Sequence, residues 1–154
     1  MPNFFETTDA AAGTSTAYTL RVGQTAQGVL NANGDHDWFS VDLAANQTYT
    51  FALVGTGVNN VQDTFLSLYA ADGVTLAASN DDGLAGKNSV VTYTTTTAGT
   101  YYIDAAAFGN VGTGQYGVSV AAGSRASFDT QMGACVIDSD SSWSATAGTG
   151  ATIS

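Results

Sequence analysis

The chain has 154 residues, which is enough for one domain with a buried core, and 44% of them are hydrophobic. Thirteen acidic residues face only Arg21, Lys87 and Arg125, so the formal net charge is −10. The lack of a basic patch argues against nucleic acids and anionic membranes as partners. No apolar run reaches the roughly 18–20 residues of a membrane-spanning helix. The lone Cys135 excludes an internal disulfide bond and a cysteine-based zinc site, and the lone His36 excludes a paired-histidine zinc motif.

The first residues of the chain lack the basic and apolar regions of a classical signal peptide. Three explanations are open at this point. The protein is cytoplasmic, the chain is a trimmed piece of a longer one, or export uses a signal located elsewhere.

Apolar and polar residues alternate between clusters of Gly, Asn and Asp. This pattern predicts many short strands without crossover helices, and hence an all-β antiparallel sandwich or jelly roll. In chain order, about nine strands are expected over residues 17–22, 25–30, 37–43, 47–54, 64–70, 74–79, 89–96, 100–107 and 114–120. In the third of these, alternation places Phe39, Val41 and Leu43 in the core and Trp38 on the other face.

The composition changes near residue 123. Ser, Ala, Thr and Gly dominate from there on, and the alternation weakens. We therefore expect residues 1–122 to form the sandwich, and residues 123–154 to be a linker or the truncated start of a following domain.

Twelve of the 13 acidic residues are Asp, which favours loops and calcium sites, whereas Glu favours helices. An Asp-Gly turn centred on Asp72 would set position 64 opposite position 80. Three carboxylates and an amide would then meet at the open end of that hairpin, namely those of Asp63, Asn80, Asp81 and Asp82. Such carboxylates repel one another unless a cation lies among them, and oxygen ligands favour calcium. Ordinary turn chemistry explains the same residues equally well.

A second acidic set lies in two segments. Glu6 and Asp9 precede the first expected strand, and Asp35 and Asp37 precede the 37–43 strand. Two Asp residues separated by one residue present both carboxylates on one side of an extended backbone, a common beginning of calcium ligation.

Eight motifs, in this order and spacing, resemble the bacterial pre-peptidase C-terminal domain. They are ETTD (6–9), GVL (28–30), GDHDWFSVDL (34–43), YTF (49–51), DTFLSLYAADG (63–73), NDDG (80–83), GTYYI (99–103) and GQYGVSV (114–120). The resemblance covers roughly residues 5–121. It implies a β-sandwich of jelly-roll type that accompanies secreted peptidases and other exported proteins and has no catalytic residues. We accordingly expect a secreted protein whose export signal lies outside this chain.

The collagen-binding modules of clostridial collagenases are similar to this family. The resemblance implies a calcium ion held by an acidic N-terminal segment and an Asp-containing loop, which by position are Glu6, Thr8 and Asp9 with Asp35 and Asp37. This chain has fewer acidic residues in that segment, which implies a weaker or incomplete site.

The tail resembles the opening of a serralysin-like metallopeptidase domain, in the segments IDSDSSW (137–143) and GATIS (150–154). This resemblance implies that the parent protein is a secreted metallopeptidase.

The chain itself is not expected to be an enzyme. His36 is the single conventional base, we interpret it as an exposed loop residue, and no G-x-S-x-G elbow is present. The leading hypothesis is a non-catalytic, calcium-binding accessory module that aids the stability, secretion or substrate tethering of a neighbouring catalytic domain. The alternative is a module that binds a polysaccharide or a matrix protein through one sheet face, with Trp38 either on that surface or covering the end of the sandwich.

Overall fold

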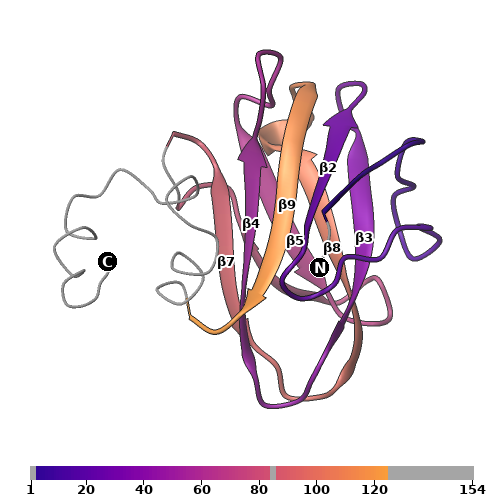
Figure 1. Ribbon diagram of the computed structural model, residues 1–154, viewed down its shortest axis with the longest axis vertical. Helices are drawn as coiled ribbons and strands as arrows, with labels where there is room; N and C mark the ends of the chain where they lie inside the picture. Colours follow the sequence, from indigo (N-terminus) through magenta and orange to yellow (C-terminus); the bar gives the residue numbers. More distant parts are fainter. Residues whose placement is uncertain (1–2, 84–85, 125–154) are drawn as a thin grey trace, which may run out of the picture.

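The computed structural model describes residues 3–83 and 86–124, and these form a two-layered β-sandwich (Figure 1). The described residues contain nine strands and one short 3-10 turn. In chain order they are β1 (Phe4–Phe5), β2 (Thr25–Leu30), β3 (His36–Leu43), β4 (Thr48–Gly55), β5 (Thr64–Tyr69), β6 (Leu76–Asn80), β7 (Ser89–Thr94), β8 (Gly99–Ala107), η1 (Phe108–Asn110) and β9 (Gly114–Ala122). The all-β sandwich prediction is confirmed, while its jelly-roll type stays a prediction.

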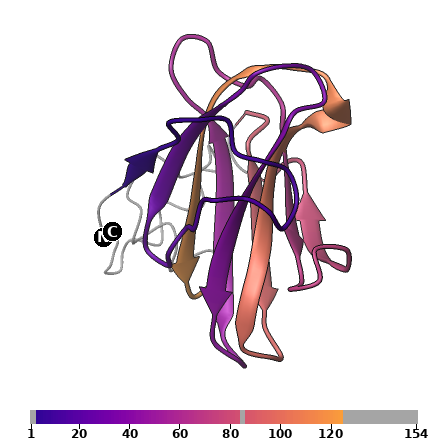
Figure 2. The same cartoon turned by 90° about the vertical axis from the view of Figure 1, so that its right-hand side faces the viewer.

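One sheet has the strand order β1-β2-β9-β4-β7 and the other has the order β3-β8-β5-β6. All pairs are antiparallel except β1 with β2, where Phe4 lies opposite Ala26 in parallel register. Figure 2 shows the two layers from the side, with the indigo N-terminal segment crossing from β1 toward β3. This segment therefore closes one open side of the sandwich.

The core lies between the sheets and contains the inward residues of both. The predicted alternation of β3 is confirmed, because Phe39, Val41 and Leu43 are buried between the layers. Burial of such apolar side chains provides the main stabilisation, at about 25 cal/mol per Å² of apolar surface removed from water.

The first predicted strand, over residues 17–22, was wrong. Residues 17–22 form no strand, and their backbone pairs with β3 through an isolated parallel bridge between Thr19 and Ser40. Leu20 is nevertheless fully buried, and Tyr18 packs against the core. The strand that the pattern missed is β1, whose two residues are too few to show a period.

The hairpin of β5 and β6 is displaced from its predicted register by two residues. Leu66, rather than position 64, lies opposite Asn80, and the register shifts between Leu68 and Tyr69. Asp72 caps its own turn, since its carboxylate accepts hydrogen bonds from the N–H groups of Val74 and Thr75, both at 2.8 Å. The connection is thus longer than a two-residue Asp-Gly turn.

Residues 125–154 lie outside the described residues, as do the acids of the tail, Asp138 and Asp140. The proposed boundary between a sandwich over 1–122 and a separate segment over 123–154 stays a prediction. No helix in the described part of the chain is long and apolar enough to cross a membrane.

Candidate metal site

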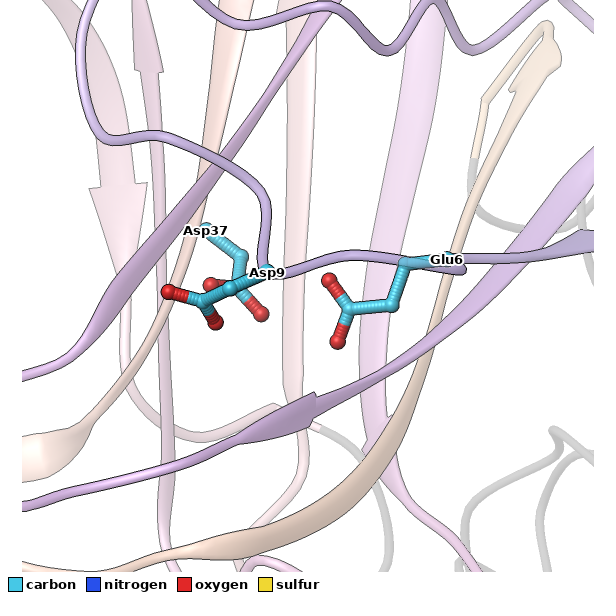
Figure 3. A group of neighbouring side chains, drawn as sticks. All are labelled: Glu6, Asp9 and Asp37. Carbon is cyan, nitrogen blue, oxygen red and sulfur yellow. The ribbon is translucent and has the colours of Figure 1, made fainter.

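Three carboxylates from two distant segments meet where the N-terminal segment crosses to β3. Glu6 and Asp9 belong to that segment, and Asp37 is the second residue of β3. One carboxylate oxygen of each lies within 4.8 Å of those of the other two (Figure 3). Within residues 3–83 and 86–124, this is the group of three such side chains that could hold a metal ion.

The backbone of β2 holds Glu6 in place. The N–H of Glu6 donates to the carbonyl of Gln27 at 2.8 Å, which continues the parallel pairing of β1. Its carboxylate accepts hydrogen bonds from the N–H of Val29 at 2.6 Å and of Ala10 at 3.1 Å. Both ends of the segment 6–10 are therefore fixed by one side chain.

Gly28 provides the space for this arrangement. It lies opposite Tyr116 in the β2–β9 register. A Cβ atom at Gly28 would lie 2.4 Å from the hydroxyl of Tyr116 and 2.8 Å from Oε2 of Glu6. A glycine is thus required here for close approach, since this backbone has no positive φ.

Asp37 is fully buried, which is unusual for a carboxylate. Its Oδ2 accepts a hydrogen bond from the Tyr116 hydroxyl at 2.7 Å, and its Oδ1 is buried with no hydrogen-bond partner. An unpartnered buried oxygen is costly, by about 1–3 kcal/mol or more for a charged group. A partner for Oδ1 would have to be an ion or molecule bound among the carboxylates of Glu6, Asp9 and Asp37.

The electrostatics of the ion-free site favour protonation. Burial is the main cause that raises the pKa of Asp37, and the charges of Glu6, Asp35 and Asp9 add to it. Against the lowering effect of the Tyr116 hydrogen bond, the pKa reaches about 8. Burial also raises the pKa of Glu6, in spite of its two backbone N–H donors. The pKa of Tyr116 is raised by burial and by Asp37, so its hydroxyl stays protonated and donates. A cation would reverse this balance for the carboxylates.

Asp9 and Asp35 are joined through Asn31. The side-chain amide of Asn31 donates to Oδ1 of Asp9, and its backbone N–H donates to Oδ2 of Asp35 at 2.6 Å. Asp35 therefore supports the loop that holds Asp9, and it contributes negative charge without joining the group of three. Both oxygens of Thr8 contact the hydroxyl of Tyr18, its carbonyl at 2.9 Å and its side-chain hydroxyl at 3.4 Å.

The residues present fit an ion that prefers oxygen ligands. Calcium takes six to eight oxygens and tolerates irregular geometry, and the three carboxylates supply several of these. The donor set holds no sulfur or imidazole, which zinc and copper prefer. Glu6, Asp9 and Asp37 would hold the ion, with water completing its coordination.

The four residues of the predicted hairpin site have other partners. Asp63 lies 3.5 Å from Nζ of Lys87, and the amide of Asn80 donates to the carbonyl of Val90 at 3.0 Å. Asp81 uses its carbonyl to accept the Ser89 hydroxyl, and Asp82 donates its N–H to Oδ1 of Asn80 at 3.4 Å. Their carboxylates do not form a group of three within the described residues. Because the hairpin register is shifted, its open end differs from the predicted one.

The interpretation of His36 as an exposed loop residue was wrong. His36 begins β3, and its Nδ1 lies 2.9 Å from Oδ2 of Asp104 while Nε2 lies 2.8 Å from Oδ1 of Asn110. The hydrogen bond to Asp104 raises the pKa of His36 to about 9, against the effect of burial. With acceptors at both nitrogens, the imidazole is charged and structural, which also argues against a role as a general base.

Trp38 lies on the outer face of its sheet, as alternation predicts, and is 8% exposed. It stacks on Tyr69 with ring centroids 4.8 Å apart, and it contacts Tyr102 at 5.9 Å. Trp38 is thus covered by neighbouring rings.

Sequence reasoning missed Tyr116 and Gly28 as parts of the site. The alternation of strand residues could have indicated Asp37 and Tyr116. Each lies two residues from a buried apolar residue of its own strand, Phe39 and Val118 respectively, and so shares its inward face. A polar side chain in an inward row must find a partner.

The family model of the bacterial pre-peptidase C-terminal domain matches residues 35–107. This chain is therefore similar to the family over the stretch that contains strands β3 to β8. The match includes Asp37, begins after Glu6 and Asp9, and ends before Tyr116. Pre-peptidase C-terminal domains are non-catalytic accessory domains that are associated with peptidases. A search of the curated proteins found no match.

A solved structure of a pre-peptidase C-terminal domain supports the fold of this chain. The corresponding domain of a collagenase from Bacillus anthracis has a TM-score of 0.52 at 20% identity, covering 67% of this chain and 92% of its own. Two further chains are similar with lower scores. The surface-associated copper-binding protein CorA of Methylomicrobium album BG8 has a TM-score of 0.48 at 11% identity, covering 80% and 98% of the two chains. The periplasmic lysozyme inhibitor PliG of Aeromonas hydrophila has a TM-score of 0.44 at 14% identity, covering 78% and 99%.

Proposed function

We propose that this domain binds calcium through Glu6, Asp9 and Asp37. The observation that carries the proposal is the buried, unpartnered Oδ1 of Asp37, which lies among two further carboxylates. A cation there would remove the repulsion between the three groups and the cost of burying Asp37. The ion would also join β1 to β3, and so one sheet to the other.

The role of the bound ion is to stabilise an accessory module of an exported bacterial protein. We infer that the parent protein is a secreted peptidase, on the basis of the family and of the tail segment, and that the module aids its stability, secretion or substrate tethering. In this role the chain has no catalytic activity of its own.

Thermal unfolding in calcium and in chelator tests the proposal. A ligand that binds the folded state stabilises it by about 2.7 kcal/mol at a hundredfold excess over its Kd. Glu6→Gln and Asp9→Asn should each reduce the calcium-dependent shift of the unfolding midpoint. Asp63→Asn is the matched control, since Asp63 pairs with Lys87 elsewhere, and it should keep the full shift. A wild-type midpoint that calcium leaves unchanged would refute the proposal.

A second candidate function is the binding of a polysaccharide or a matrix protein on the outer face of the β3-β8-β5-β6 sheet. Half-buried Tyr69 and Tyr102 lie on that face beside Trp38, and half-exposed Phe108 contacts Phe65 at a centroid distance of 6.2 Å. Aromatic side chains are favourable contact surfaces for such ligands. Retention of the wild-type domain, and not of a Tyr102→Ala variant, on insoluble collagen or cellulose would support this function.

A further inference from the structure

The turn between Glu6 and Asp9 has one prominent side-chain anchor, the hydroxyl of Tyr18. The backbone N–H groups of Thr7 and Thr8 donate to this oxygen at 2.8 and 3.0 Å, and the hydroxyl donates to the carbonyl of Thr8 at 2.9 Å. One hydroxyl thereby uses its donor and two acceptor positions on the backbone of two adjacent residues. Both threonines are exposed, so water would otherwise occupy these backbone groups.

The ring of Tyr18 is held as firmly as its hydroxyl. It stacks on Phe4 with centroids 6.0 Å apart and an interplanar angle of 13°, and it contacts the buried Phe39 at 6.0 Å. Phe4 belongs to β1 and Phe39 to β3, so the ring connects the two strands that flank the site. The hydroxyl position is therefore fixed from both sides.

Other contacts hold the ends of the segment and leave its middle to Tyr18. Glu6 is bound to β2 at one end, and Ala10 is buried at the other. Asp9 is exposed, and its contact within the described residues is with the side chain of exposed Asn31. Without the Tyr18 hydroxyl, residues 7 and 8 would be free to move, and Asp9 with them.

We propose that Tyr18 is the positioning residue of the ion site, fixing the turn that sets Asp9 against Glu6 and Asp37 before the ion arrives. This inference rests on the proposed calcium site and adds to it a residue that does not touch the ion. Ordering a residue costs about 1–2 kcal/mol of conformational free energy, which binding must supply when the turn is not already ordered. The Tyr18→Phe variant keeps the ring and loses the hydroxyl, so calcium should bind it about tenfold more weakly, with unchanged stoichiometry.

Isothermal titration of calcium into the whole chain, after removal of metal with chelator, tests the inference. Thr7→Ala should bind as the wild type does, because the anchor uses the backbone N–H of residue 7. Tyr49→Phe is the matched control, because the Tyr49 hydroxyl also accepts a backbone N–H, that of Ala44 at 3.0 Å. Tyr49 lies far from the site, at the opposite end of β4 from Gly55, which pairs with Tyr116. It should also keep wild-type affinity.

Unfolding midpoints separate positioning from plain structural support. If Tyr18 positions the site, the calcium-dependent gain in midpoint shrinks in Tyr18→Phe while the midpoint in chelator changes little. A loss that is equal with and without calcium, or an unchanged Kd in Tyr18→Phe, would overturn the role of Tyr18 and leave the calcium site standing. No calcium binding by the wild type would overturn both.

Discussion

The Asp37→Asn variant should be more stable than the wild-type domain in chelator and less stable than it in excess calcium. Burial raises the pKa of Asp37 from 3.8 to about 8. In the unfolded chain this carboxyl group loses its proton at about pH 4. Without an ion, the folded domain therefore keeps this proton between about pH 4 and pH 8. Stability from this group is complete below about pH 4 and is lost as pH rises toward 8.

The magnitude follows from the same shift. At 1.36 kcal/mol for each pKa unit, the loss at pH 7 is at most ~4 kcal/mol. Asparagine is neutral at every pH, its carbonyl oxygen accepts the Tyr116 hydroxyl, and its amide nitrogen can donate to the neighbouring carboxylates. We expect a gain of about 1–3 kcal/mol for the variant in chelator at pH 7, and no gain at pH 4.

Urea unfolding, followed by circular dichroism in chelator and in calcium, measures both effects. Asp42→Asn is the matched control on the same strand, because Asp42 is exposed and accepts the Thr100 hydroxyl at 2.8 Å. It should keep the calcium response and show no gain in chelator. An Asp37→Asn variant that is less stable than the wild type in chelator at pH 7, or that keeps the calcium response, would refute the reasoning.

Three further predictions follow from the geometry. Calcium affinity should fall as pH drops below about 8, because Asp37 must lose its proton before it can bind the ion. Calorimetry in buffers of different ionisation enthalpy should detect the released proton. An affinity that is independent of pH between 5 and 8 would contradict this. Gly28→Ala should destabilise the domain by about 2 kcal/mol or more and weaken calcium binding, because its methyl group would displace the Tyr116 hydroxyl and Glu6; wild-type values in denaturant and calcium titrations would be the contrary result. His36→Gln should cost about 1–2 kcal/mol at pH 6, a figure reduced for the partial exposure of His36. That cost should disappear by pH 10. The stabilisation by charged His36 is complete below pH 6.5 and is lost as pH rises through its folded pKa of about 9. An equal cost at pH 6 and pH 10 in urea unfolding would show that the ion pair with Asp104 is not its source.

Residue alternation predicted the fold well because each strand of a two-layered sandwich has one inward face. It placed Phe39 and its row correctly, whereas the strand that it predicted over residues 17–22 is absent. Alternation reports which side chains are buried, whereas hydrogen-bonded pairing depends on the neighbouring strand. The two-residue β1 could not be found for that reason, since its partner β2 is 20 residues away.

The candidate site was predictable in part. Glu6, Asp9 and Asp37 were named, but so were residues that the structure gives other contacts, among them Thr8 and Asp63. The hairpin prediction depended on a turn centre, and an irregularity beside Leu68 displaced the register. The roles of Tyr116 and Gly28 could not be derived from local sequence, because they depend on β9 pairing with β2 across 88 residues.

The position of β9 between β2 and β4 also determines the order in which the domain can assemble (Figure 1). The last strand of the described residues is the middle strand of its sheet, so β2 has no partner toward β4 until residues 114–122 have been synthesised. Tyr116, which holds Asp37 from 79 residues away, arrives with it. Long-range pairing of this kind slows folding. A ribosome-bound or translocating chain that ends before residue 114 therefore carries the acidic residues without Tyr116. If the proposed site binds calcium, we expect high affinity only once β9 has entered the sheet.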